Sequence, residues 1–420
     1  MSSDSTILTR PLSQFFYYSV LCTIPFYYWR QVTPFLPVDW YITAILGLIV
    51  IIYMVNQKDM PALFSNNLNK WFLFFFFVNI VSTIFSPYQS EAVSGLVILV
   101  QVYIFIFINL TFLTEKGLVN ILPYVLAASV GFNSIIASLD YFFGVELFYV
   151  SESARSYGVT TGANNLSLMS VFVIPLLFNK LLTAKSPLGF FGSLFLILIN
   201  IAGLISSESR GGFLIFFVMA IMVLYINRTR FQPRFFGLAI SIIGLCMLLV
   251  ATAIPDAYFK RQQSLLSEEQ DTSIQRRTAY IKVGIQSFFD HPLLGTGTFT
   301  FPQVWLDSRE TLFFKMAERG AHNTYLDTLV GMGIIGLMIF LGLLSRIFRD
   351  FITAIQNFDL VNDLDMKDMA SAYLVSFLTV LAYCLLKTLI DHKFFILSIS
   401  ISQVLYFISK NKKDRLYGPV

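Results

Sequence analysis

Two kinds of side chain in this sequence could do chemistry: one histidine at the start of an apolar stretch, and arginines in the polar segments between such stretches. His322 is followed by Asn323 and then by glycines at 331, 333 and 336. Imidazole has the ordinary pKa nearest neutrality, so His322 is the best candidate for a group that accepts a proton. A histidine at a helix start can also serve only as a cap together with Asn323, and for a lone histidine this structural role is the commoner one.

Four arginines in polar segments are the candidate anion ligands: Arg155, Arg210, Arg276 and Arg277. A guanidinium presents a fixed fork of donors that fits two phosphate oxygens, and it stays charged at any physiological pH. Arginines gathered at one membrane surface therefore favour a phosphate or diphosphate ligand, most naturally a lipid diphosphate. Each arginine also has a structural alternative. Arg210 can reach lipid headgroups, Arg155 can pair with Glu152, and Arg276 and Arg277 can belong to a helix at the membrane surface.

Composition shows which elements must position these groups. The 420 residues are 56% hydrophobic and only 13% charged, whereas soluble domains carry roughly 25% charged residues. We therefore expect an all-α polytopic membrane protein. Apolar runs of about 20 residues predict about twelve membrane-spanning helices, near residues 13–29, 39–56, 70–86, 93–113, 118–143, 165–183, 188–206, 212–227, 235–255, 323–345, 370–390 and 393–409.

Topology follows from the distribution of lysine and arginine. With the N-terminus inside, most of these residues in the short loops fall on the cytoplasmic side, so both termini are expected in the cytoplasm. The chain then divides into helices one to nine (1–255), a large external loop (256–322), and helices ten to twelve with a cytoplasmic tail (323–420). This topology brings the four arginines and His322 to the external face of the membrane.

The external loop and the later helices carry further signals. Apolar residues at helical spacing within 275–289 predict an amphipathic helix with Arg277 near its start. The glycines after His322 permit close helix packing. Lys387 and Asp391, four residues apart near the outer end of helix eleven, are expected to neutralise each other. Residues 345–369 look like a polar, solvated connector.

Several function classes find no support in the sequence. It shows no basic helix or basic-aromatic patch suited to nucleic acid. Its three cysteines and three histidines form no convincing metal site, and no nucleotide-binding motif is present. We therefore expect no metal and no cofactor, and a donor that arrives already activated.

The motifs together resemble one family, the bacterial O-antigen ligases and polymerases. His322-Asn323, nine residues, Gly333, two residues and Gly336 match the ligase histidine pattern at every fixed position. The Ser-Arg-Gly segment at 209–211 is similar to that superfamily's arginine segment. Arg277 followed by the His-Pro-Leu-Leu-Gly-Thr-Gly run at 291–297 is similar to its loop. Arg155 to Asn165 is similar to a looser Arg-x-x-Gly…Asn element.

The resemblance implies a metal-independent, GT-C-like glycosyltransferase of the bacterial inner membrane. It would transfer a glycan from undecaprenyl diphosphate to an acceptor at the periplasmic face. Arg210 and Arg277, with Arg155, would hold the diphosphate, and His322 would act as general base or position the acceptor. Arg276, Asn323 and Asp391 would support them. One departure lies at residues 280–281, Tyr-Ile, where the family's loop helix often has tryptophan.

Three functions remain open from the sequence. The leading one is an O-antigen ligase whose acceptor is lipid A-core. The nearest alternative is an O-antigen or exopolysaccharide polymerase, which uses the same lipid-linked donor and a growing glycan as acceptor. A remote alternative is a transporter of lipid-linked sugars, although charged residues that gather at one surface are not typical of transporters.

Overall fold

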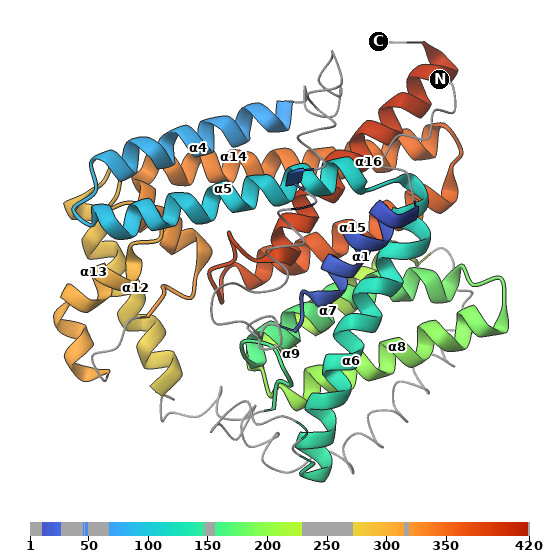
Figure 1. The fold of residues 1–420 in the computed structure, drawn as a ribbon, viewed down its shortest axis with the longest axis horizontal. Coiled ribbons are helices and arrows are strands. Elements are labelled where there is room, and N and C mark those ends of the chain that lie inside the picture. The colour runs from blue at the N-terminus through green and yellow to red at the C-terminus, as the bar shows by residue number, and fades with distance from the viewer. Residues whose placement is uncertain are drawn as a thin grey trace. The chain divides into compact units, whose positions relative to one another are not determined.

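The computed structural model describes residues 11–26, 45, 47–48, 67–145, 147, 156–228, 272–314 and 319–418. Every regular element in these ranges is a helix (Figure 1), which confirms the all-α expectation for the described part of the chain. The predicted helix near 235–255, most of the one near 39–56, and Arg155 lie outside the described residues.

The helices fall into two compact units, which are described separately. The first contains residues 1–24, 30–125 and 273–420, and the second contains residues 25–29 and 126–272. The elements of the first unit are α1 (Pro11–Thr23), α4 (Asn67–Ile84), α5 (Gln89–Phe112), the π-helical turn η3 (Gly117–Ile121), α12 (Thr272–Asp290), α13 (Phe301–Asp307), the 3-10 turn η4 (Arg309–Phe313), α14 (Thr324–Leu360), α15 (Leu364–Tyr383) and α16 (Lys393–Tyr417). The second unit holds most of α6 (Leu122–Phe143), then α7 (Ala163–Leu182), α8 (Pro187–Ser206) and α9 (Arg210–Ile226).

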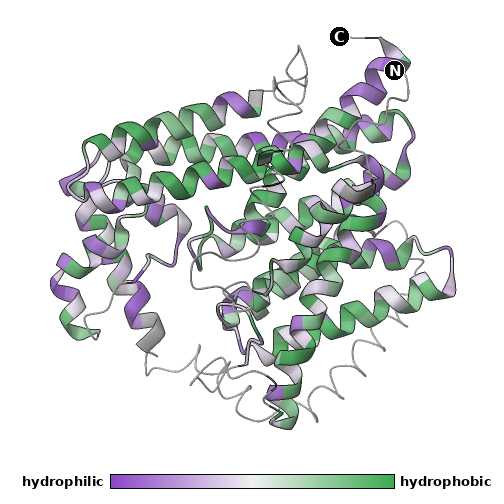
Figure 2. Cartoon of the chain, in the orientation of Figure 1, coloured by the Kyte–Doolittle hydropathy of each residue, from purple (hydrophilic) through white to green (hydrophobic). Residues whose placement is uncertain are grey.

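Six helical segments of the described chain are long and apolar enough to cross a membrane: α5, η3 with α6, α7, α8, α14 and α16. Two shorter apolar helices are α4 and α9. Figure 2 shows the hydrophobic residues that run along these helices. Their bounds agree within a few residues with most of the predicted apolar runs, so the protein is a multi-pass membrane protein. The number of twelve spans and the external loop remain predictions.

Two predicted boundaries are wrong. Helix α14 does not end near residue 345 but continues to Leu360, so the expected solvated connector is mostly helical. Its polar composition hides a helical period, because Ile347, Phe351, Ala354 and Phe358 recur every three or four residues and are all fully buried. Helix α15 ends at Tyr383 instead of near residue 390.

Helices α4 and α14 run side by side in opposite directions. The Ser82 hydroxyl, near the C-terminal end of α4, donates a hydrogen bond of 2.7 Å to the Gly331 carbonyl near the start of α14. At the other end of α4, the Trp71 indole lies against Gly342. Between them, the rings of Phe75 and Phe340 are 5.8 Å apart. This pair of helices carries the histidine segment at one end and a basic segment at the other.

In the second unit, α7 is the central helix and packs against α8 and α9. Most of its side chains are buried although only part of its sequence is strongly apolar. Asn200 on α8 donates to the Ala127 carbonyl of α6 at 3.2 Å, which ties these two helices together inside the unit. The N-terminal ends of α7 and α9 lie next to each other, because the Ser209 hydroxyl before α9 donates to the Asn164 side chain of α7 at 2.9 Å.

Candidate active site

His322 occupies an unusual backbone position. Its φ is +49°, in the left-handed region that costs a non-glycine residue roughly 1–2 kcal/mol and that histidine enters more readily than most. The next residue, Asn323, is the N-cap of α14: its Oδ1 accepts hydrogen bonds from the amides of Tyr325 and Leu326 at 3.0 and 3.1 Å. Asn323 thus caps the helix by itself, and the His322 imidazole does not contribute to the cap.

Helix α14 is broken at Gly333, which has φ +62° and ψ −163°, a conformation open essentially to glycine alone. The loop at 291–297 fills the break. Ile334 N donates to the Pro292 carbonyl at 2.9 Å, and Thr296 N donates to the Val330 carbonyl at 2.8 Å. The loop therefore replaces the helix's own hydrogen bonds, and the two sequence motifs form one structural unit.

The glycines of the histidine motif make this close approach possible. A Cβ atom at Gly333 would lie 2.3 Å from the Leu293 carbonyl oxygen, and one at Gly331 would lie 2.7 Å from the Gly297 carbonyl oxygen. Both distances are too short for any real carbon contact. The sequence predicts close helix packing at these glycines, whereas at Gly331 and Gly333 the close neighbour is the backbone of the loop. At Gly336, the atoms nearest to a Cβ would belong to the Met332 side chain of the same helix.

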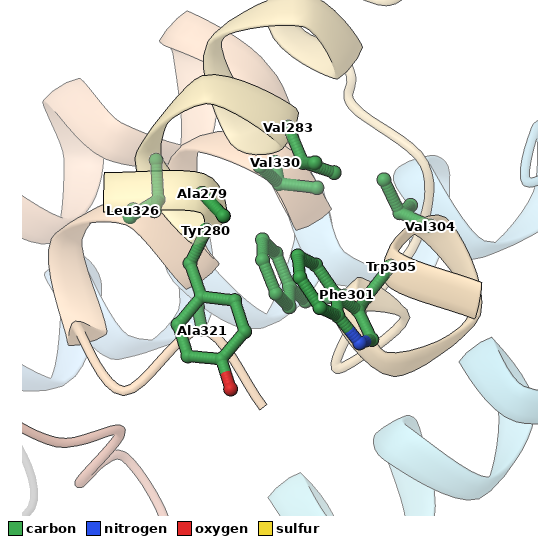
Figure 3. Packing of buried hydrophobic residues seen from close by; sticks show 9 residues of the cluster. All are labelled: Ala279, Tyr280, Val283, Phe301, Val304, Trp305, Ala321, Leu326 and Val330. Carbon is green, nitrogen blue, oxygen red and sulfur yellow. The ribbon is translucent and has the colours of Figure 1, made fainter. Parts of the chain in front are cut away.

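The predicted amphipathic helix at 275–289 is present as α12, and it carries two apolar faces. Tyr280 and Val283 are buried in a core shared with Phe301 and Trp305 of α13 (Figure 3). Ile281 and Phe289 point away from this core and are exposed. The Tyr280 ring lies edge-on to the Trp305 ring at 4.7 Å, so α12 and α13 are held together at this point.

Tyr280 also connects this core to the histidine. Its ring centroid is 5.9 Å from that of His322, and Leu326 and Val330 of α14 belong to the same core. Tyr280 is one of the two residues, 280 and 281, at which the sequence departs from the tryptophan of the resembling family. The ring of Tyr280 lies beside the histidine, and Trp305 supplies an indole to the same cluster.

Four cationic side chains act on His322. Burial lowers the pKa of its imidazole most, followed by the charges of Arg277, Lys387, Arg276 and Arg319, and the resulting pKa is about 4. By its accessible surface the residue is nevertheless exposed, so a substrate can reach it. At neutral pH the imidazole is therefore uncharged and able to accept a proton, within a positively charged environment. The charges of Arg276 and Arg277 thus act on His322, and their predicted role as ligands of a diphosphate remains a prediction.

Arg319 and Asp327 are members of this region that sequence reasoning missed. Arg319 lies three residues before His322, and its Nε is buried with no hydrogen-bond partner among the described residues. Asp327 is buried one turn into α14 and interacts electrostatically with Asp391. An acidic residue in the first turn of an otherwise apolar helix was the available signal for Asp327. For Arg319, the only signal was its short distance from His322 along the chain.

Lys387 and Asp391 do interact, but not as a pair on a helix. Both lie in the non-helical segment between α15 and α16, so the expected helical i,i+4 geometry is wrong. Thr324 holds this segment against the start of α14. Its amide donates to the Cys384 carbonyl and its hydroxyl to the Lys387 carbonyl, both at 2.7 Å. This contact brings the charge of Lys387 to His322.

Arg210 belongs to the second unit, where it is the first residue of α9 and half-buried. Ser209 is the N-cap, and its Oγ accepts from the Gly212 amide at 3.1 Å while donating to Asn164. Glu208 has φ +46°, a second strained position next to a predicted ligand, and it accepts a hydrogen bond from Tyr141. The Asn164 contact joins two sequence motifs, the Ser-Arg-Gly segment and the Arg-x-x-Gly…Asn element.

The residues that were predicted to form the site therefore lie in two groups, one in each unit. Arg276, Arg277, Asn323 and His322 lie together in the first unit, with Lys387 near them; Arg210 lies in the second. That Arg210 joins the first group in one cavity remains a prediction, as does any role of Arg155. Within the described ranges, no group of three or more histidine, cysteine or acidic residues could hold a metal ion.

One comparison with known proteins gives a match. Residues 194–341 match the family model Wzy_C, described as O-Antigen ligase. The matched segment contains Arg210, the whole of α12, the loop at 291–297, His322 and the broken first half of α14. The resemblance drawn from the motifs is therefore confirmed. No curated protein matches the chain.

Proposed function

Because residues 194–341 carry a domain of the O-antigen ligase family, we propose that this membrane protein is a glycosyltransferase that uses a lipid-linked glycan donor. More specifically, we propose that it transfers a polysaccharide from undecaprenyl diphosphate to lipid A-core at the periplasmic face of the bacterial inner membrane. The observation that most supports this proposal is the group of residues before α14: His322 lies beside Tyr280, and the charges of Arg277, Lys387, Arg276 and Arg319 act on its imidazole.

Each part of that arrangement has a role in glycosyl transfer. The reaction breaks the bond between the sugar and the diphosphate, so negative charge develops on the leaving group. Arg277 and Arg276, and in our proposal also Arg210, would stabilise this charge. His322 would accept the proton of the attacking acceptor hydroxyl, or position that hydroxyl, and its neutral form is the one suited to either task.

The loop at 291–297 supports the same proposal because it fixes the first part of α14, the helix that begins directly after the histidine segment. The loop at 291–297 and the broken helix α14 share backbone hydrogen bonds at Val330, Gly331 and Ile334. Ser86 also donates to the Thr296 carbonyl at 2.5 Å, which fixes the loop to the turn before α5. A catalytic side chain on such a rigid support keeps its geometry without a cost in entropy at the moment of reaction.

A polymerase is the second candidate, because the matched family domain supports ligases and polymerases in general. It would use the same donor and the same diphosphate ligands, and its acceptor would be the growing glycan. Deletion of the gene separates the two. Loss of all O-chain from lipid A-core, with long glycans left on the carrier lipid, is the result expected of a ligase. Core that carries a single repeat unit would instead identify a polymerase.

A histidine exchange tests the site itself. Asparagine tolerates the left-handed backbone of residue 322, so His322→Asn removes the imidazole with little added strain. We expect it to abolish complementation of the deletion. The control is His392→Asn: His392 Nδ1 caps α16 by accepting from the Phe394 amide, and asparagine can do the same. Equal loss in both variants, or wild-type activity of the His322 variant, would remove His322 from the mechanism.

A further inference from the structure

A second cationic site lies at the other end of α14, far from His322. Helices α4 and α14 enclose a groove of about 480 Å³ there, to which Lys70 and Trp71 of α4 and Arg346 and Arg349 of α14 contribute. Figure 1 shows α4 lying along α14. From Thr324 to Arg346 the helix advances by roughly 33 Å at about 1.5 Å per residue, close to the thickness of a bilayer's hydrocarbon core. The groove therefore lies at the membrane boundary opposite to the candidate active site.

The groove is positively charged. Of its three cations, only Arg346 has an acidic partner, Asp350, at 2.8 Å, and that carboxylate is buried beneath it. Lys70 and Arg349 are exposed and form no ion pair within the described ranges. The Arg346 Nε is buried and has no hydrogen-bond partner among the same residues. The site thus presents two charges without an acidic partner beside a third, paired guanidinium, which suits a phosphate group.

The walls of the groove are apolar. The Trp71 ring packs so closely on Gly342 that a Cβ there would lie 2.3 Å from the indole, which forms a flat side. Phe74, one turn further along α4, is 60% exposed at the groove. An aromatic surface that continues from a cationic pocket toward the hydrophobic part of a helix is complementary to a lipid with a charged headgroup and an acyl chain.

We propose that this groove binds one anionic phospholipid of the surrounding bilayer. The headgroup phosphate contacts Lys70, Arg346 and Arg349, and an acyl chain lies on Phe74. Scattered lysines and arginines at a membrane boundary attract anionic lipid only diffusely. This site differs because its cations come from two helices, line one cavity and share it with an indole. The proposal is independent of the glycosyltransferase assignment.

The test compares two double variants of the full-length protein. Lys70→Gln/Arg349→Gln removes the two unpaired groove cations and leaves the Arg346–Asp350 pair intact. Lys410→Gln/Arg415→Gln is the matched control, since it removes one lysine and one arginine that are exposed on α16 outside the groove. The detergent-purified proteins are titrated with phosphatidylglycerol, phosphatidylcholine or inorganic phosphate, and bound lipid is counted by native mass spectrometry.

For the wild type we expect one tightly held phosphatidylglycerol and no comparable phosphatidylcholine. The groove variant should bind phosphatidylglycerol about thirtyfold more weakly, which is about 2 kcal/mol for two lost cations near the surface. The control variant should keep the wild-type affinity. Equal weakening in both variants would indicate diffuse attraction and overturn the proposal. If millimolar inorganic phosphate displaced the lipid and stabilised the protein as much as the lipid does, the groove would be a site for free anions, which would overturn the proposal.

Discussion

Substitution of Gly333 by alanine should open the junction between α14 and the loop at 291–297. The residue has φ +62° and ψ −163°, which costs a side-chain-bearing residue about 1–3 kcal/mol. The new Cβ would also lie 2.3 Å from the Leu293 carbonyl oxygen and 2.7 Å from the Leu294 amide nitrogen. The loop must therefore move away, because both contacts are with backbone and not with a flexible side chain.

The displaced loop loses hydrogen bonds as well. The bonds from Ile334 N to Pro292 O and from Gly297 N to Gly331 O are both 2.9 Å, and each contributes about 1 kcal/mol. Together with the backbone term, the junction should lose about 3–5 kcal/mol. In hydrogen exchange, this predicts roughly a hundred- to a few-thousandfold faster exchange of the Gly297 and Ile334 amides, since about 1.4 kcal/mol corresponds to a factor of ten.

Mass spectrometry of exchanged peptides that cover residues 290–300 and 328–340 measures this effect in the intact protein. The control is Gly192→Ala on α8, where a Cβ meets no atom within 4 Å and alanine should be neutral or slightly stabilising. Transfer activity should fall in the Gly333 variant and stay unchanged in the control. Wild-type exchange and activity in Gly333→Ala would refute the conclusion that this junction positions the histidine.

Three further predictions concern the two groups of site residues. In Arg277→Gln, one of the charges that lower the His322 pKa from its ordinary value to about 4 is removed, so the pKa should rise; NMR titration of labelled histidine measures it, and an unchanged pKa would contradict the electrostatic account. Asn323→Ala should destabilise the protein by about 1 kcal/mol through loss of the cap, whereas Asn323→Asp should keep both stability and transfer activity. An Asp variant that is stable but inactive would mean that the Asn323 amide group binds a ligand. In thermal unfolding, Ser209→Ala should be more destabilising than Asn164→Ala, because Ser209 loses both its cap and its bond to Asn164.

The sequence predicts the helices better than the connections between them. Apolar runs located most helices within a few residues, and the helical spacing of Tyr280, Ile281 and Ile285 located α12 correctly. The end of α14 was missed because the buried positions after Arg346 are separated by charged residues, so hydropathy falls while the helical period continues. Local composition alone does not distinguish a helix that leaves the membrane from a loop.

The break at Gly333 shows what a single sequence lacks. Several glycines in an apolar helix are equally typical of close packing between helices, which is what they predicted here. Their real partner, the backbone of residues 292–297, lies about forty positions earlier, and no residue type signals a pairing of backbone groups. Likewise, Lys387 comes close to His322 only through the hydrogen bonds of Thr324. Both contacts depend on tertiary structure and not on local preference.

The low pKa of His322 has a consequence for the proposed reaction. An imidazole with a pKa of about 4 is a weak base. Burial lowers this pKa most, and two of the cations that lower it further, Arg277 and Arg276, are proposed ligands of the donor. A bound diphosphate would offset their charge and so raise the histidine pKa toward its ordinary value near 6.5. The imidazole would then be a better base with the donor in place than without it, which would favour proton transfer from the acceptor hydroxyl once the donor is bound. Donor binding should accordingly be accompanied by an upward shift of the His322 titration, and binding without such a shift would separate the anion site from the histidine.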